Sequence, residues 1–298
     1  MARDVMIMVA PNGARRGKSD HPTLPITPAE LVSDLVGCAA AGATAVHLHV
    51  RDAGGNHSLD PDLYRAAIDP IRGALPDLAI QVTTESVGRY GPAEQMAMIR
   101  ALRPDAVSLA LREIVPDAAA EPEAGAFLAW LRDSGIAPQF ILYAPEDVRR
   151  CIDLVERGVM PFARPFLLFV LGRYSSDGQS SPADLDPFVA ALADRPFPWS
   201  VCAFGRRESE CALAAARRGG HVRVGFENNL HLPDGGLAPG NAAIVSATAA
   251  LLRAEGFRIM GPRGAGLLLG LRTAGSFGLP GSGGLDGRAD QVREGIAQ

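Results

Sequence analysis

The sequence predicts an α/β protein whose eight parallel strands close into a (β/α)8 barrel. Eight short apolar runs recur along the chain, spaced roughly 25 to 40 residues apart. Helix signals follow most of these runs, as a repeated strand–helix unit requires. The length of 298 residues suits one large barrel or two average domains.

Most of the predicted strands are apolar throughout, which is typical of parallel strands that are buried on both faces. They occupy residues 5–10, 45–50, 79–84, 106–110, 139–143, 166–171, 198–202 and 221–225.

The predicted helices begin at recognisable N-terminal signals. Thr27-Pro28-Ala29-Glu30 forms a capping box with proline at the first helical position, and this helix runs to Ala41-Gly42. Similar signals begin helices near residues 91, 144 and 181, and two further helices are predicted at 208–218 and 241–255.

An open, doubly wound sheet is the alternative architecture. No G-x-G-x-x-G motif follows an early strand, which disfavours its dinucleotide-binding version. We therefore predict a single TIM-barrel domain over residues 1–272. Residues 273–298 are rich in glycine and are predicted to form a C-terminal tail or a subunit-bridging arm.

Composition bounds the class of function. The net charge is −4, 47% of residues are hydrophobic and 21% are charged, with no basic stripe, so no nucleic-acid partner is expected. No uninterrupted apolar run is long enough to span a membrane, and the first run is too short for a signal peptide. We expect a cytoplasmic protein whose four scattered cysteines are mostly buried.

His47-Leu48-His49 is the strongest candidate for a functional site. Residues i and i+2 of a strand share a face, so both imidazoles point to one side of the predicted second strand. Glu227 follows the eighth strand, which closes on the first, so it can approach the pair across one strand. Two imidazoles and a carboxylate suit catalytic Zn²⁺, or divalent iron, manganese or cobalt. The alternatives are two hydrogen-bonded strand-end histidines and a salt bridge from Glu227 to Arg223 or Arg51.

Other candidates follow the strands of the predicted barrel, where catalytic side chains gather. Arg223 alternates with valines on the last strand, and a buried arginine needs a substrate carboxylate or an acidic neighbour. Arg15 and Arg16 are interpreted as an anion clamp or as solvated side chains. The remaining candidates are Asn12 in a tight turn, Thr83, Thr84 and Ser108 at strand ends, and Glu85. His21, His57, His221 and His231 are interpreted as surface or loop histidines.

These residues together resemble the β-keto acid cleavage enzyme family, from Val9 to about Leu271. The resemblance is carried by residues 10–15, 20–22, 47–52, 81–84, 107–109 and 222–229. It implies a TIM barrel, a homotetramer, and zinc held by His47, His49 and Glu227. It also implies conversion of a β-keto acid and acetyl-CoA to acetoacetate and a new acyl-CoA. Arg223 matches the family's arginine, and Thr83 or Thr84 matches a substrate-binding hydroxyl.

The chain departs from the best-known family member at two positions. Asn228 stands where that enzyme has an aspartate and cannot act as a base. Asp52 or Glu85 is therefore predicted to take this role, with Asn228 left to bind substrate. Arg15 replaces a glutamate that receives a substrate amine, so a neutral or anionic β-keto acid is predicted.

Two other functions fit the same residues. One is a metal-dependent aldolase or lyase that acts without CoA, and the other is a metal-binding barrel without catalysis. No phosphate-binding motif is visible, so the CoA phosphates have only generic candidates: Arg164, Arg173, Arg206 and Arg207.

Overall fold

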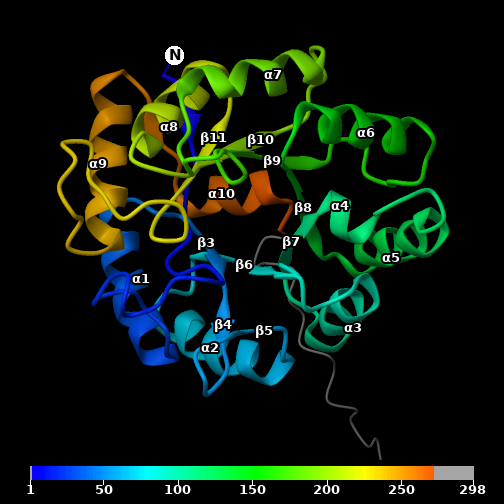
Figure 1. The fold of residues 1–298 in the computed structure, drawn as a ribbon, viewed down its shortest axis with the longest axis horizontal. Helices are drawn as coiled ribbons and strands as arrows, with labels where there is room; N and C mark the ends of the chain where they lie inside the picture. Colours follow the sequence, from blue (N-terminus) through cyan, green and yellow to red (C-terminus); the bar gives the residue numbers. More distant parts are fainter. Residues whose placement is uncertain (1, 272–298) are drawn as a thin grey trace, which may run out of the picture.

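The computed structural model describes residues 2–271. Eight parallel strands form a closed barrel in the order β10–β11–β2–β3–β6–β7–β8–β9 (Figure 1). This confirms the predicted (β/α)8 TIM barrel. Every predicted strand is present within a few residues: β2 (Ile7–Val9), β3 (Ala45–Leu48), β6 (Ala79–Thr83), β7 (Ala106–Ala110), β8 (Ala137–Leu142), β9 (Phe166–Leu171), β10 (Trp199–Ala203) and β11 (His221–Val224).

Helices surround the barrel and cover the outer faces of its strands (Figure 1). They are α1 (Pro28–Ala41), α2 (Pro61–Ala74), α3 (Pro92–Leu102), α4 (Leu111–Ile114), α5 (Glu121–Ser134), α6 (Pro145–Glu156), α7 (Asp186–Leu192), α8 (Glu208–Arg217) and α9 (Asn241–Ala254). The helix predicted near residue 181 begins as a short 3-10 helix, η1 (Pro182–Leu185), which leads into α7. Between residues 2 and 271, no helix is long and apolar enough to cross a membrane.

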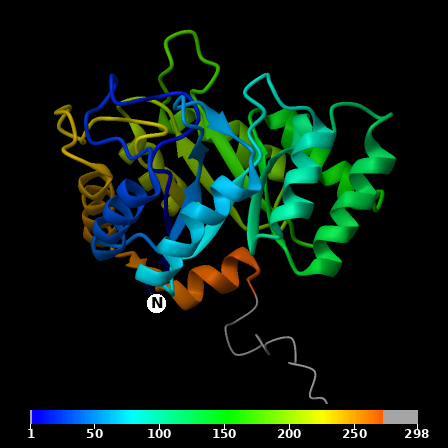
Figure 2. The same ribbon diagram turned by 90° about the horizontal axis from the view of Figure 1, so that it is seen from below.

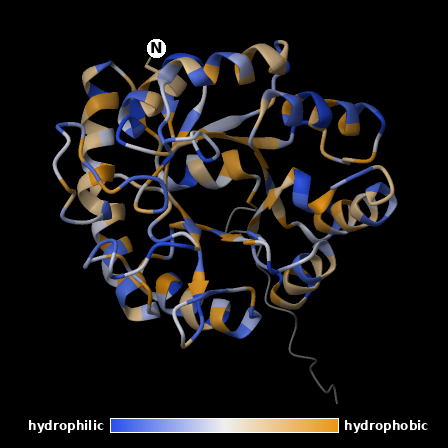
Figure 3. Cartoon of the chain, viewed as in Figure 1, coloured by the Kyte–Doolittle hydropathy of each residue, from blue (hydrophilic) through white to orange (hydrophobic). Residues whose placement is uncertain are grey.

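The helix ends follow the predicted cap chemistry. Thr27 Oγ1 accepts a hydrogen bond from the Glu30 amide, and the Glu30 carboxylate accepts one from the Thr27 amide. Hydrophobic residues concentrate on the barrel strands and on the inward sides of the helices (Figure 3). The strands and helices therefore share one large core, which holds the strand ends in place.

The N-terminal end of the barrel is closed by α10 (Pro262–Leu269), which lies beneath the strands (Figure 2). Its Ala265 and Leu269 pack against Met6, Met8 and Phe166 inside the barrel. A two-stranded pair, β1 (Asp4–Val5) with β12 (Arg258–Ile259), brings the chain to this helix. The first predicted strand is therefore divided, because Val5 pairs with β12 and only residues 7–9 join the barrel.

The long loops gather at the opposite end of the barrel, where the strands finish (Figure 2). A small antiparallel hairpin of β4 (Val50–Arg51) and β5 (His57–Ser58) rises there, directly after β3. The Gly-rich segment predicted from residue 273 lies outside the described residues.

Candidate metal centre and active site

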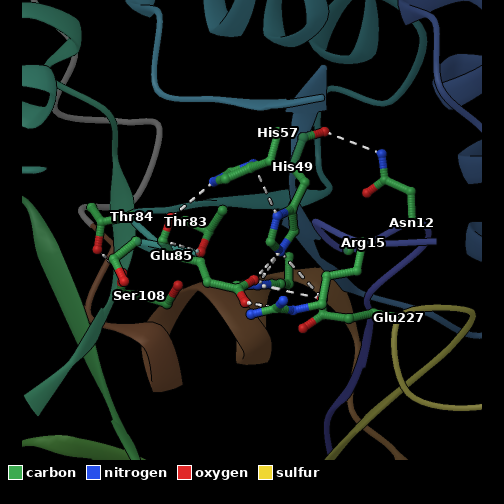
Figure 4. Close-up of polar contacts among 12 residues, drawn as sticks. Asn12, Arg15, His49, His57, Thr83, Thr84, Glu85, Ser108 and Glu227 are labelled. Carbon is green, nitrogen blue, oxygen red and sulfur yellow. Dashed lines mark hydrogen bonds and ion pairs between the residues drawn. The ribbon is translucent and has the colours of Figure 1, made fainter. Parts of the chain in front are cut away.

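His47, His49 and Glu227 converge at the C-terminal end of the barrel. His47 lies on β3 and His49 just after it, while Glu227 follows β11, and β2 alone separates those strands. The Nε2 atoms of the two histidines are 3.1 Å apart, and Glu227 Oε2 is 3.5 Å from His47 Nε2 and 3.4 Å from His49 Nε2. Figure 4 shows His49 and Glu227 pointing toward one another. Glu227 therefore approaches the two histidines across one strand, as predicted.

The donor atoms of this trio fit a divalent metal ion. Two nitrogens bound tetrahedrally to zinc lie about 3.3 Å apart, close to the spacing of the two Nε2 atoms here. Glu227 Oε2 is buried and has no hydrogen-bond partner among residues 2–271, although it faces both rings. A cation between the three atoms would supply the missing partner.

The charge states of these residues also suit metal binding. Burial, followed by the positive charge of Arg223, lowers the pKa of His47 to about 3, so its ring stays neutral. Burial by itself raises the pKa of Glu227. The Arg223 guanidinium and the two imidazoles outweigh burial and hold this pKa well below its ordinary value. A neutral imidazole and an ionised carboxylate are the forms that bind metals.

A polar chain inside the barrel orients His47. Its Nδ1 donates to Gln81 Oε1 at 2.9 Å, and Gln81 Nε2 donates to Gln139 Oε1 at 3.1 Å. Gln139 Nε2 then donates to Ser200 Oγ at 3.0 Å. An amide oxygen accepts, so His47 carries its proton on Nδ1 and presents a bare Nε2 to the site. The sequence analysis missed Gln139 and Ser200, which point inward from β8 and β10.

Arg223 is the buried cation of the site, with 3% of its side chain exposed. Its Nη2 donates to Glu227 Oε1 at 2.9 Å and lies 3.2 Å from Cys202 Sγ. Glu227 is thus the acidic neighbour expected beside a buried Arg223. The Nε and Nη1 atoms of Arg223 have no partner among the described residues. A charged guanidinium with unused donors can bind a carboxylate.

Two glycines let the loops close around Glu227. Gly13 has a φ of +61°, and a Cβ there would lie 2.6 Å from Glu227 Cγ. Gly225 follows β11 directly and has a φ of +132°, and a Cβ there would lie 2.7 Å from the Ala10 carbonyl oxygen. Both the backbone conformation and the close contacts exclude larger residues at these positions.

A cavity of ≈ 110 Å³ opens beside the trio. It brings together seven of the predicted site residues: Asn12, Arg15, His47, Thr83, Glu85, Arg223 and Glu227. Arg16, Tyr143, Arg173 and Phe204 complete much of its wall. Asn12 also supports the backbone of the candidate metal site, since its Nδ2 donates to the His49 carbonyl oxygen at 3.2 Å (Figure 4).

Glu85 lines the cavity and lies near two of its arginines and the candidate metal ligand His49. One carboxylate oxygen is 3.5 Å from Arg173 Nη2 and 4.0 Å from Arg15 Nε, and the other is 4.0 Å from His49 Nε2. Asp52, the other predicted base, lies outside the cavity. Its carboxylate accepts hydrogen bonds from the Gly54 and Asn56 amides in the hairpin turn, so its position does not support a catalytic role.

Thr84, Ser108 and Asn228 are buried but do not line the cavity. Thr84 Oγ1 donates to the Ser108 carbonyl oxygen, and Ser108 Oγ lies 3.5 Å from the Val82 carbonyl oxygen. Their hydroxyls therefore serve neighbouring strands, and contact with substrate is not supported by this arrangement.

Asn228 links the site to a buried acid that the sequence analysis missed. Its Oδ1 lies 3.4 Å from Arg223 Nη2, and its Nδ2 donates to Glu208 Oε1 at 3.2 Å. Burial raises the pKa of Glu208 to about 8. Three N–H groups donate to its carboxylate and partly oppose this rise, because they favour the ionised form. Asn228 thus connects Arg223 to Glu208 through buried contacts.

The interpretation of four histidines as surface or loop residues is wrong for two of them, His57 and His221, which are buried on strands. His57 is 3% exposed and contacts His49, with the two Nδ1 atoms 3.4 Å apart. His221 lies on β11 near the barrel floor and accepts a hydrogen bond from the Met6 amide. His21 is a loop residue but is buried, with its Nε2 against the Ala238 carbonyl oxygen. Each of these histidines contacts a hydrogen-bonding partner far away in the sequence, so its position cannot be predicted from its sequence neighbours.

Comparisons with known proteins identify the family to which the chain belongs. A model of the beta-keto acid cleavage enzyme family matches residues 4–271. The 3-oxoadipate:acetyl-CoA acetyltransferase of Cupriavidus necator is 30% identical over 280 residues, covering 91% of this chain and 96% of the relative. The 3-keto-5-aminohexanoate cleavage enzyme of Fusobacterium nucleatum is 30% identical over 278 residues, covering 91% and 100%.

Solved structures show the same fold at low sequence identity. The apo structure of ObcA aligns with a TM-score of 0.68 at 18% identity, covering 84% of this chain and 66% of that one. The 3-dehydroquinate dehydratase of Geobacillus kaustophilus aligns with a TM-score of 0.55 at 12% identity, covering 85% and 92%. The family match spans nearly all described residues and confirms the resemblance inferred from the sequence. The chain belongs to the β-keto acid cleavage enzyme family.

Proposed function

We propose that this protein is a zinc-dependent acyltransferase that converts a β-keto acid and acetyl-CoA to acetoacetate and a new acyl-CoA. One observation carries the proposal: the His47–His49–Glu227 trio stands beside Arg223, whose unused N–H groups can hold a carboxylate. A metal site next to a carboxylate site suits a β-keto acid, which offers both a keto oxygen and a carboxylate. The names of two relatives, an acetyl-CoA acetyltransferase and a cleavage enzyme, support the same reaction.

The reaction balances as two linked carbon–carbon steps. A proton leaves C2 of the β-keto acid, and C2 bonds to the acetyl carbonyl carbon as the thioester C–S bond breaks. The released CoA thiolate then bonds to the original keto carbon, and the bond from that carbon to C2 breaks. The C2 carbanion recovers a proton, which leaves acetoacetate and the new acyl-CoA.

Each step has a candidate residue in the cavity. His47, His49 and Glu227 would hold the zinc ion, which when bound polarises the keto oxygen. Arg223 binds the carboxylate, and Glu85 takes and returns the C2 proton. Glu85 suits this role because it lines the cavity and has a carboxylate oxygen 4.0 Å from His49 Nε2. Thr83 and Asn12, which line the same cavity, are assigned to substrate binding.

The charge of the cavity favours a neutral or anionic β-keto acid. Four arginines line it against two glutamates, and a divalent ion would add further positive charge: Arg15, Arg16, Arg173 and Arg223 against Glu85 and Glu227. A substrate with a second carboxylate reduces this excess, whereas an amine increases it. Arg173 is also a candidate for CoA phosphate. Arg164 precedes β9, at the barrel end opposite the cavity, so we do not assign it to CoA binding.

The family resemblance further leads us to propose a cytoplasmic homotetramer. Size-exclusion chromatography with light scattering measures the assembly directly. A single species of four chains is the expected result, and a monomer at micromolar concentration contradicts this part of the proposal.

The test of the proposed function is acetoacetate formation by the zinc-loaded protein. The purified protein is incubated with acetyl-CoA and a panel of anionic, neutral and amino-substituted β-keto acids. Acetoacetate should form only when acetyl-CoA is present, and removal of the metal by a chelator should abolish it. Cleavage that continues without acetyl-CoA would instead support a metal-dependent aldolase or lyase. No acetoacetate from any acid would remove the proposal.

A further inference from the structure

His57 contacts the outer side of a metal-ligand candidate. The β4–β5 hairpin folds it over His49, with the two Nδ1 atoms 3.4 Å apart (Figure 4). The other ring nitrogen of His57, Nε2, lies 3.0 Å from the Glu85 carbonyl oxygen. The ring is 3% exposed, so both nitrogens have protein partners and little access to water.

These contacts determine where each proton sits. A backbone carbonyl only accepts, so His57 Nε2 must carry its hydrogen. A buried imidazole with no carboxylate partner is neutral, which leaves His57 Nδ1 as an acceptor. His49 Nδ1 must then carry the hydrogen that His57 accepts. His49 is left with a bare Nε2, and this atom faces His47 and Glu227.

We propose that His57 is a positioning residue that holds His49 in its Nδ1–H tautomer, ready to bind metal through Nε2. The inference rests on the metal site of the proposed function. It gives His49 the same kind of support that Gln81 gives His47. The two ligands would thus be oriented by different elements, the barrel interior and the hairpin. A partner on the outer nitrogen fixes both the tautomer and the ring plane of a ligating histidine.

The hairpin is anchored well enough to hold this geometry. His57 pairs in register with Arg51 on the opposite strand. Arg51 is 9% exposed, and its Nε and Nη2 donate to the Gly13 carbonyl oxygen at 3.1 and 2.6 Å. Its Nη1 donates to the Gly55 carbonyl oxygen at 2.8 Å. The hairpin is therefore tied to the first loop, which also packs against Glu227.

The experiment compares two substitutions of His57 with a buried histidine elsewhere. His57→Phe keeps the ring volume but removes the acceptor, whereas His57→Asn places an amide oxygen close to the position of Nδ1. His221→Asn is the matched control, because His221 accepts from the Met6 amide near the opposite end of the barrel. Zinc dissociation constants are measured by chelator competition. Histidine tautomers are read in the metal-free proteins from ring ¹⁵N chemical shifts.

The expected result is a roughly 10- to 100-fold weaker zinc affinity for His57→Phe, with His49 shifted toward the Nε2–H form. His57→Asn and His221→Asn should stay within about threefold of the unmodified protein. An unchanged affinity in His57→Phe overturns the inference. If that variant does not fold, the unmodified protein still decides, because Nε2–H on its own His49 contradicts the assignment.

Failure of the proposed function would look different. A protein that binds no divalent metal removes the metal site itself. Metal binding that is equal in both His57 variants removes only the role of His57.

Discussion

Gln81 accepts a hydrogen bond from His47, with 2.9 Å between Oε1 and Nδ1, and the two residues are paired in register on β6 and β3. The contact lies inside the barrel, where both side chains are buried. Gln81 is in turn held by Gln139, so its amide cannot rotate freely. The inner wall of the barrel therefore fixes the orientation of His47, one of the proposed metal ligands.

Substituting Gln81 tests this support. Gln81→Leu removes the acceptor, and we expect zinc affinity to fall roughly 10- to 100-fold. Gln81→Glu keeps an acceptor on Nδ1 and should bind zinc at least ten times more tightly than the leucine variant. Chelator competition measures both values. Equal affinities for the two variants would show that the hydrogen bond has no part in metal binding.

Substitution of Arg223 tests the proposed carboxylate binding separately from the proposed metal binding. Arg223→Met leaves the Glu227 carboxylate without its cation and removes the donors on Nε and Nη1. We expect kcat/KM to fall on the order of a thousandfold, because a buried charged contact is lost. Zinc affinity should change little, because removal of a positive charge beside the proposed metal ligands offsets the loss of the guanidinium that keeps Glu227 ionised.

Arg223→Lys is the matched control, because it keeps the charge without the planar fork of donors. It should recover part of the activity lost in Arg223→Met. Loss of zinc in step with activity in the methionine variant would contradict the separate role of Arg223.

Arg15 should control the charge of the accepted substrate. Its side chain is 60% exposed, so it can be changed at little cost to the fold. Arg15→Glu places a carboxylate at the mouth of the cavity. The ratio of kcat/KM for an amino-substituted over a dicarboxylic β-keto acid should rise at least tenfold, which is about 1.4 kcal/mol. An unchanged ratio would mean that other residues determine the charge of the accepted substrate.

Acid should destabilise the fold through buried histidines such as His221. Burial, followed by the charge of Arg3, lowers the pKa of His221 to about 4, below the ordinary value near 6.5. The unfolded chain therefore binds more protons between these values. The contribution of neutral His221 to the free energy of unfolding is fully present above pH about 6.5 and is lost as the pH falls toward 4.

The substitution His221→Asn removes this titration but keeps an acceptor for the Met6 amide. Between pH 7.5 and 5 it should lose about 2 kcal/mol less stability than the unmodified protein. Urea unfolding at the two pH values measures the difference. An identical loss in both proteins would contradict the assignment of a neutral, buried His221.

The barrel strands were predictable because each is a short, mostly apolar run, and most are followed by polar residues. The adjacency of β11, β2 and β3 followed from barrel closure and placed Glu227 near the histidine pair. By contrast, α10 contains two glycines and has little helical tendency of its own. It forms because Ala265 and Leu269 fill the open end of the barrel, which no local pattern reveals.

The supporting residues of the site were harder to predict than its ligands. His57 stands on a strand of two residues, and its partner His49 is fixed only when the hairpin folds back. The Asp52-Ala53-Gly54-Gly55-Asn56 segment did carry a turn signal, since aspartate commonly accepts amide hydrogen bonds in turns. That signal accounts for the position of Asp52 outside the cavity.

The fate of the acetyl group tests the central claim most directly. The zinc-loaded protein is given an unlabelled β-keto acid and acetyl-CoA carrying ¹³C at the acetyl carbonyl. The proposed transfer predicts acetoacetate labelled at C3 alone, together with an unlabelled new acyl-CoA, because C2 of the acid bonds to the acetyl carbon. Acetoacetate without label, or label in the new acyl-CoA, would contradict it.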